Sequence, residues 1–223
     1  MSICIGVANK ARDVKSVYIG VNGTARRVKS IYYGVNNKAQ LVYSSISSII
    51  KDIPAVVGQT CTWAGYNWTV VHVTTDLIYM ILTNIHSKCK YGPYGRYHDS
   101  TVYAQCREFL NTIDAVYRNA LSDVTIDGIT CKVFLPTVVM AGTGVSNHDY
   151  TKYPTFDYVN SKYTNEYSNR KANYNGTATP WWLSDGFNEA DSSWYVTNRG
   201  RILASGDITS TYGFRPCVAV RRK

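Results

Sequence analysis

The pattern of hydrophobic and polar residues repeats every fourteen positions near the start of the chain. Segment 7–20 is followed by a near copy at 21–34, and a third copy begins at Val35 and decays near Tyr43. Each copy places Asn-Gly or a similar pair between β-prone residues, and such pairs tolerate the positive φ angles of a tight hairpin turn. The repeat therefore predicts a series of short β-hairpins over residues 1 to about 45.

A repeat module of this size has too little apolar surface to bury a core of its own. Its tyrosines need a neighbouring surface to cover them, namely Tyr18, Tyr32, Tyr33 and Tyr43. Oligomerisation would supply that surface. The repeat resembles short repeats in tail-fibre and minor structural proteins of bacteriophages, which implies an attachment or assembly segment and a homo-oligomer, with a trimer favoured.

The hydrophobic pattern changes after a Ser-rich stretch at 44–48. We therefore divide the chain into an attachment or oligomerisation module, residues 1–48, and a ligand-binding domain, residues 49–223. Alternation around a Gly turn over 58–73 predicts a hairpin, and the apolar run 77–82 predicts a buried strand.

An amphipathic helix is predicted after the N-cap pair Asp99-Ser100. The apolar side chains that share one face of this helix are Val102, Cys106, Phe109, Leu110, Ile113 and Val116. Asn111 is expected to break it into two shorter helices.

After the helix, Asp127-Gly128 predicts a turn that precedes a strand over 129–135. Segment 143–179 is polar and rich in Gly, Asn and Tyr, which predicts a long loop of the kind that often carries function. Strands followed by a helix and further strands give an α+β fold.

Apolar and polar positions alternate again in the last forty residues. Plain core positions are predicted at Val196, Ile202, Ile208, Val218 and Val220. The other positions combine aromatic residues with short hydrogen-bonding side chains, a mixture typical of binding surfaces. The candidate ligand-binding residues are Ser184, Asp185, Phe187, Asn188, Trp194, Tyr195, Thr197, Asn198, Arg199, Arg201, Ser205, Asp207, Thr209 and Tyr212. An ordinary solvated face is the alternative.

Four residues at the two ends of this segment are predicted to be structural: Trp181, Trp182, Gly213 and Arg215. A buried Trp pair and an Arg before a Pro can brace strand ends through packing and backbone hydrogen bonds.

Composition adds limited information about partners. With 45% hydrophobic residues the chain can form a substantial core, and nineteen Tyr against five Phe favour surfaces that bind. The net charge of +9 is spread along the chain without a dense basic stripe or a nucleic-acid motif, so we expect no nucleic-acid partner. There is no signal peptide and no apolar run of eighteen residues, so no membrane insertion is expected.

Cysteine and histidine spacing gives no support for a metal or a cofactor. Six cysteines are far apart without a C-x-x-C pair, and reduced thiols are expected. The four histidines, His72, His86, His98 and His148, lack zinc-site spacing. Calcium at Asp185, Glu189 and Asp191 is a minor alternative, because no calcium-loop motif is present.

The order of several short motifs resembles a known family. These motifs are Gly58-x-x-x-x-Trp63-x-Gly65-x-x-Trp68, Cys106-Arg-Glu-Phe-Leu-Asn111, Lys132-Val-Phe-Leu-Pro136, Trp181-Trp182-Leu183 and Tyr212-Gly-Phe-Arg-Pro216. Residues 55 to 220 resemble domains of gut bacteria and their phages that look like an offshoot of the formylglycine-generating-enzyme variety of the C-type lectin fold. The resemblance implies a C-type lectin-like fold preceded by the small β-hairpin repeat module.

Two functional branches follow from this resemblance. Oxidase-type members need closely placed cysteines near the C-terminus, whereas this chain has Cys217 there without a second cysteine nearby in sequence. Variable proteins of diversity-generating retroelements, including phage receptor-binding proteins, display changing side chains on a fixed lectin-like backbone. The second branch is favoured, and with it a protein that is not an enzyme.

The expected function is therefore recognition of a host cell-surface protein or glycan by a phage or prophage tail-associated protein. Such a protein would assemble in the bacterial host cytoplasm with other tail proteins and reside in the virion tail. Two alternatives stay open: an oxidase-like enzyme that uses Cys217, and a structural tail component without a ligand.

Overall fold

The structure is a computed structural model of the chain, and it combines 39% strand with 16% helix, which confirms the mixed α+β class. It describes residues 4–7, 10–13, 17–21, 24–28, 30–35, 38–44, 49–93, 96–145, 148–187 and 191–222. Among these residues, none of the helices combines the length and the apolar character needed to cross a membrane.

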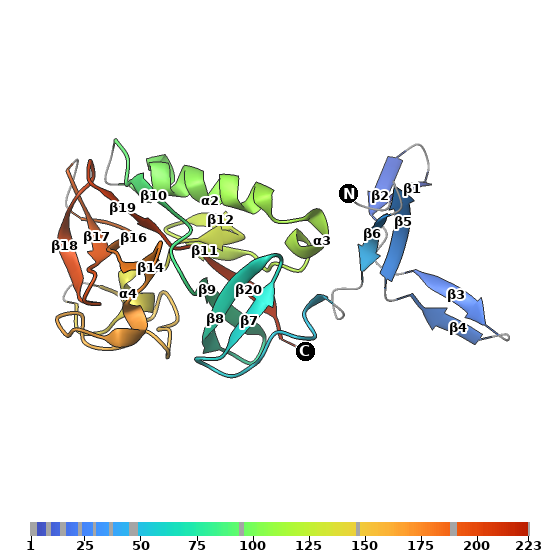
Figure 1. Cartoon of the computed structure of the whole chain (residues 1–223), viewed down its shortest axis with the longest axis horizontal. Helices are drawn as coiled ribbons and strands as arrows, with labels where there is room; N and C mark the ends of the chain where they lie inside the picture. The colour runs from blue at the N-terminus through green and yellow to red at the C-terminus, as the bar shows by residue number, and fades with distance from the viewer. Residues whose placement is uncertain are drawn as a thin grey trace.

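The N-terminal repeat forms three antiparallel hairpins, as predicted (Figure 1). They are β1 (Cys4–Val7) with β2 (Lys10–Asp13), β3 (Tyr18–Val21) with β4 (Thr24–Arg27), and β5 (Ser30–Val35) with β6 (Lys38–Ser44). The pairs Cys4–Asp13 and Tyr18–Arg27 occupy equivalent positions one repeat apart. The predicted turn pairs at 8–9, 22–23 and 36–37 lie outside the described residues.

The first large sheet has the strand order β13-β20-β9-β8-β7 and is antiparallel throughout. Its strands are β7 (Thr60–Trp63), β8 (Tyr66–Val73), β9 (Leu77–Leu82), β13 (Val133–Phe134) and β20 (Cys217–Arg221). Ala64 and Gly65 have φ angles of 52° and 82°, the turn that the hairpin prediction required. The last strand, β20, lies beside β9, so the beginning and the end of the domain share one sheet.

The second large sheet has the order β10-β19-β16-β17-β18 and carries most of the predicted binding residues. Its strands are β10 (Ser87–Lys90), β16 (Trp181–Phe187), β17 (Ser192–Val196), β18 (Ile202–Asp207) and β19 (Thr211–Phe214). β16 and β19 pair in parallel through Trp181 and Gly213, and the other neighbours are antiparallel.

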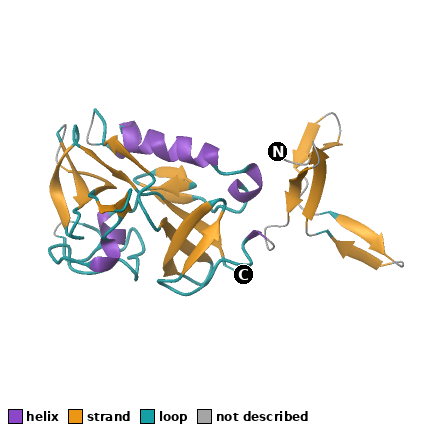
Figure 2. Ribbon diagram, viewed as in Figure 1, coloured by secondary structure: helices purple, strands orange, loops and turns teal. Residues whose placement is uncertain are grey.

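Helix α2 (Thr101–Thr112) begins at the predicted N-cap, where the Ser100 hydroxyl accepts a hydrogen bond from the Tyr103 N–H at 3.1 Å. After the 3-10 turn η1 (Tyr97–Asp99), α2 lies along the domain and is separated from α3 (Ala115–Arg118) (Figure 2). The break lies at 113–114, whereas Asn111 is helical, so the predicted position was two residues early.

A small hairpin and a short helix follow. Strands β11 (Val124–Ile126) and β12 (Ile129–Cys131) flank the predicted turn, in which Asp127 and Gly128 have φ angles of 50° and 80°. The predicted strand over 129–135 is interrupted at Lys132, whose ammonium group donates to the carbonyl oxygens of Arg118 and Leu121. Helix α4 (Val138–Ala141) is capped by Thr137, whose hydroxyl accepts from the Met140 N–H.

The long segment 143–179 is mostly loop, as predicted, with the turn η2 (Ser168–Arg170) and the short strands β14 (Asn173–Tyr174) and β15 (Thr177–Ala178). Arg170, the last residue of η2, is fully buried. The Arg170 guanidinium donates to five backbone carbonyl oxygens, those of Val159, Ser161, Lys162, Asn165 and Gly200. One buried cation thus organises the loop and ties it to the turn between β17 and β18.

Candidate functional site

The two tryptophans predicted to be structural are fully buried in β16. The indole N–H of Trp181 donates to the Arg170 carbonyl oxygen at 2.9 Å, and that of Trp182 donates to the Cys89 carbonyl oxygen at 2.9 Å. Because both indole groups find backbone partners, the rings are fixed in orientation as well as in position.

Gly213 and Arg215 hold the other end of the C-terminal segment. A Cβ atom at Gly213 would lie 2.6 Å from Ile85 Cδ1, so the position leaves no room for a side chain. The buried Arg215 donates to the carbonyl oxygens of Leu82 at 2.8 Å and Thr83 at 3.3 Å. All four residues predicted to be structural therefore lie in the core.

Three aromatic side chains form what we call the aromatic platform: Trp182, Tyr195 and Tyr212. The ring centroids of Tyr195 and Tyr212 lie 4.8 Å apart, and that of Tyr212 lies 4.5 Å from Trp182. The two tyrosines are partly buried, whereas Trp182 beneath them has no exposed surface. Strand pairing produces this arrangement, because Trp182 pairs with Tyr195, and β19, which carries Tyr212, lies beside β16 through the Trp181–Gly213 pair.

Gly206 in β18 makes room for the platform. A Cβ atom at this position would lie 2.7 Å from Trp182 Cζ3 and 2.8 Å from Tyr195 Cδ1. The missing side chain lets the two rings approach the strand closely.

Polar residues predicted to contact a ligand lie in the two turns that flank β18. Asn198, Arg199 and Arg201 are exposed in the first turn, and the guanidinium of Arg199 lies 3.4 Å from Glu166. In the second turn the exposed Asp207 accepts hydrogen bonds from the Thr209 N–H and hydroxyl at 2.8 and 2.7 Å. Thr197, partly buried, accepts from the Arg199 and Arg201 N–H groups.

Two residues predicted to contact a ligand are buried instead. Ser184 is 2% exposed, and its carbonyl oxygen accepts from the Tyr91 hydroxyl. Trp194 is 6% exposed because it lies two residues from the buried Val196 on the same side of β17, where its ring meets that of His148. The predicted residue Asn188 and the side chains of Phe187 and Ser205 lie outside the described residues.

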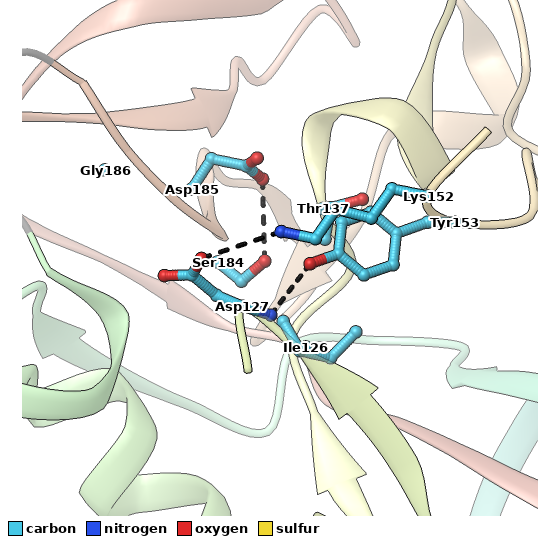
Figure 3. Close-up of a pocket in the computed structure, with 8 residues that line it drawn as sticks. All are labelled: Ile126, Asp127, Thr137, Lys152, Tyr153, Ser184, Asp185 and Gly186. Atoms are coloured by element: carbon cyan, nitrogen blue, oxygen red, sulfur yellow. Dashed lines mark hydrogen bonds and ion pairs between the residues drawn. The ribbon is translucent and has the colours of Figure 1, made fainter. Parts of the chain in front are cut away.

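A cavity of about 160 Å³ opens where β16 passes the β11–β12 turn and the start of α4 (Figure 3). Its lining residues are Ile126, Asp127, Thr137, Lys152, Tyr153, Ser184, Asp185 and Gly186. We call it the Asp185 pocket. A β-bulge between Trp182 and Gly186 is what directs this part of β16 toward the cavity.

Asp185 is the most buried carboxylate of this pocket, and 20% of its side chain is exposed. Its Oδ2 accepts a hydrogen bond from the Val138 N–H at 2.6 Å, and its Oδ1 lies 3.9 Å from His148 Nε2. Burial raises the pKa of Asp185 to about 6, while the Val138 N–H and His148 oppose the rise. The carboxylate is therefore mostly charged at neutral pH.

The remaining groups of the pocket come from segments that the sequence did not single out as functional. Lys152 Nζ lies 3.9 Å from Asp127 Oδ1 and 5.1 Å from the centre of the Tyr153 ring. The Tyr153 hydroxyl accepts from the Asp127 N–H at 2.8 Å. The tertiary contact between the 126–127 turn and the 148–153 loop assembles this site, and no local motif encodes it.

Catalytic chemistry through Cys217 has little geometric support. Cys217 has no exposed surface, and burial raises the pKa of its thiol well above the ordinary value. Cys61, Cys89, Cys106, Cys131 and Cys217 are free thiols. Within the described ranges no three His, Cys, Asp or Glu side chains are placed to hold a metal ion, and Glu189 of the calcium alternative lies outside those ranges.

Residues 77–222 match the model of a family described as a domain of unknown function, DUF6273. The match runs from β9 to the end of β20 and includes both the aromatic platform and the Asp185 pocket. No curated protein and no solved structure matches the chain.

Proposed function

We propose that the chain, which belongs to the DUF6273 family, is a ligand-recognition protein that binds through the aromatic platform and the polar turns beside it. In this proposal it is associated with a phage or prophage tail, and its ligand is a protein or glycan on the host cell surface. The observation that carries the proposal is the packing of the partly exposed Tyr212 against the fully buried Trp182, with Tyr195 beside Tyr212 and edge-on to Trp182.

A fixed aromatic surface is well suited to binding. Trp182 is anchored by its hydrogen bond to the Cys89 carbonyl oxygen, and its ring also meets that of Tyr91 at 5.4 Å. Tyr212 packs against this anchored ring and Tyr195 packs against Tyr212, so little side-chain entropy is left to lose when a ligand covers them. Aromatic residues of this kind dominate the binding energy of many interfaces.

The turns beside the platform supply polar side chains, some exposed and some held by hydrogen bonds. Arg201 and Asn198 are exposed, whereas Asp207 is held in place by the hydrogen bonds of Thr209. A surface with an aromatic centre and a polar rim matches the general anatomy of recognition sites. These turns are also the positions where substitutions would change specificity without disturbing the core strands.

The strand arrangement supports a lectin-like relationship. β20, the last strand of the domain, pairs with β9, which lies near the start of the domain. A separate sheet is built from strands between them in the chain. Within that arrangement Trp181 and Arg215 fix the ends of the C-terminal segment while the positions between them form the candidate surface. We propose a C-type lectin-like fold on these grounds.

The N-terminal hairpins complete the proposal as the attachment or oligomerisation module. Tyr18 is 59% exposed in β3, an apolar surface that a neighbouring chain or another tail protein could cover. Oligomerisation would multiply weak individual contacts of the platform through avidity. A catalytic role is the weaker alternative, because Cys217 is buried and lacks access to a substrate.

The proposal is tested by binding of the labelled full chain to a panel of gut bacterial strains. Saturable binding to some strains and not to others is expected. Periodate oxidation of surface glycans and protease treatment of the cells then separate a glycan ligand from a protein ligand. Absence of saturable binding across a broad panel would favour a structural tail component without a ligand.

A further inference from the structure

The positive charge of the chain is concentrated in the N-terminal repeat module, residues 1–48. This module holds seven of the 24 Lys and Arg residues and one of the fifteen Asp and Glu residues, which gives it a net charge of +6 out of +9. In residues 49–223, seventeen Lys and Arg residues stand against fourteen Asp and Glu residues. Two of those seventeen, Arg170 and Arg215, are buried and donate to backbone carbonyl oxygens. The positive field of the protein therefore comes mainly from the hairpins.

The register of the hairpins places the basic residues opposite uncharged ones. Every basic residue on the second strand of a hairpin pairs with an apolar or aromatic residue of the first strand. The pairs are Lys10–Val7, Arg12–Ile5, Arg26–Ile19, Arg27–Tyr18 and Lys38–Val35. Asp13, the acidic residue of the module, pairs with Cys4. Cross-strand pairing within these described strands therefore neutralises none of the five positive charges.

The basic residues recur with the period of the repeat. Arg12 and Arg26 occupy the same position of successive copies, and Lys10 and Lys38 share a position two copies apart. The side chain of Arg26 is exposed, as is that of Tyr18 on the paired strand. The hairpins that carry these residues lie at the end of the molecule beyond α3 (Figure 1). A repeated set of cations fits a partner whose anionic groups also repeat.

Charge also distinguishes between the candidate occupants of this surface. A second copy of the module carries the same net charge of +6, so repulsion opposes its approach to these strands. An uncharged polymer gains nothing from the basic residues. A polymer linked by phosphodiesters carries a negative charge on every repeating unit, and guanidinium groups bind phosphate through two parallel hydrogen bonds.

We propose that the N-terminal hairpin module binds a linear polyanion, a phosphodiester-linked polymer of the host cell surface. Its basic residues bind the phosphates, and the exposed Tyr18 adds contact area beside them. That the polymer belongs to the host surface rests on the proposed function, whereas the choice of a polyanion depends only on the charge of the module. The module then supplies a salt-sensitive contact, and the aromatic platform supplies the selective one.

The probe is a purified glycerol phosphate polymer of bacterial cell walls, immobilised on a sensor surface, with dextran as the uncharged control. Binding of the full chain should be saturable. Its affinity should fall roughly a hundredfold between about 50 and 200 mM salt, because each neutralised phosphate adds about −0.7 to the slope of log K against log salt. Absence of binding at the lower salt concentration, or equal binding to dextran, would overturn the proposal. Tighter binding to single-stranded DNA with the same number of phosphates would overturn the choice of a cell-surface polymer.

The repeat itself indicates which substitution the strands tolerate. The third copy has Gln40 at the position that Arg12 and Arg26 occupy in the first two copies, and Gln40 lies in a paired strand. The double variant Arg12→Gln and Arg26→Gln should therefore keep the hairpins and weaken polymer binding about tenfold or more, with a salt slope reduced by about 1.4. The double variant Arg12→Lys and Arg26→Lys keeps the charge and should retain most of the affinity.

The matched control is the double variant Arg107→Gln and Lys171→Gln, which removes two exposed positive charges from the other domain. It should bind the polymer like the parent. Equal losses in this control and in the Arg12 and Arg26 variant would overturn the assignment to the hairpin module. Because the assay with purified polymer contains no host receptor, its failure is distinguishable from failure of the proposed function.

Discussion

The guanidinium of Arg215 lies 5.1 Å from the centre of the Trp181 ring, and both side chains donate a hydrogen bond to the carbonyl oxygen of Arg170. Trp181 and Arg215 belong to opposite ends of the C-terminal segment. Their shared acceptor connects those ends to Arg170 in the long loop. The backbone that carries the aromatic platform is therefore anchored at both ends to one buried point.

Replacing Arg215 with Lys should destabilise the protein by about 2–3 kcal/mol, because an ammonium group cannot reproduce the planar fork that binds the Leu82 and Thr83 carbonyl oxygens. The free energy of unfolding in urea measures this loss. Arg201→Lys is the matched control at an exposed position and should change stability by less than about 0.5 kcal/mol. Equal effects of the two substitutions would show that Arg215 does not brace the segment.

Arg170→Met should cost about 3 kcal/mol or more, since it leaves buried carbonyl oxygens such as those of Val159 and Gly200 without a donor. The loop 143–179 should then become sensitive to limited proteolysis before the two large sheets do. Lys171→Met, at the neighbouring exposed position, is the control and should leave the digestion pattern unchanged. Cleavage at the same rate in both variants would contradict the role of Arg170.

Asp185→Asn should raise the stability at pH 7, in spite of removing a charge. The folded-state pKa of Asp185 is raised to about 6 from an ordinary value of 3.8, so the folded protein holds its proton more tightly than the unfolded chain does. The stability that comes from this proton is fully present below pH 3.8 and is lost as the pH rises through 6. At pH 7 the penalty is about 3 kcal/mol, which the neutral Asn avoids.

The check is the difference in unfolding free energy between Asp185→Asn and the parent at pH 7 and near pH 4. Asp207→Asn serves as a control with the opposite sign, because hydrogen bonds from Thr209 lower the pKa of Asp207 and stabilise its carboxylate above the ordinary pKa. A stability difference for Asp185→Asn that does not change with pH would refute the burial argument.

Gly206→Ala should disturb the aromatic platform, because its Cβ atom would lie 2.7 Å from Trp182 and 2.8 Å from Tyr195. The overpacking should cost about 1–3 kcal/mol and change the tryptophan fluorescence. Gly176→Ala provides the control: nothing lies within 4 Å of its Cβ atom, so it should cost only the left-handed backbone penalty at φ 81°, roughly 1 kcal/mol. Its fluorescence should match that of the parent.

Local sequence signals predicted the strands and turns well. The fourteen-residue repeat, the Gly65 and Gly128 turns and the Ser100 cap all appear in the structure because each depends on residues that are near one another in the chain. The strand predicted over 129–135 was too long. It is interrupted at Lys132, whose ammonium group donates to two carbonyl oxygens of the preceding segment. Such a contact has no periodic signature.

The candidate site was only partly predictable. Composition and alternation singled out Tyr195 and Tyr212 as candidates, but their packing around Trp182 depends on which strands become neighbours. Trp194 was wrongly predicted to be on the binding surface because it is aromatic. Its position two residues from the buried Val196 would have predicted burial. Lys152 and Tyr153 were missed, because the pocket forms between segments that are distant in the sequence.

The most direct test of the recognition proposal compares the affinity of the full chain with that of the double variant Tyr195→Ala and Tyr212→Ala on a host strain that the parent binds. Tyr103→Ala, a partly buried tyrosine on α2, serves as the matched control. The platform account predicts that the double variant, with an unfolding transition like that of the control, loses about a hundredfold in affinity. Affinity equal to that of the control would contradict it.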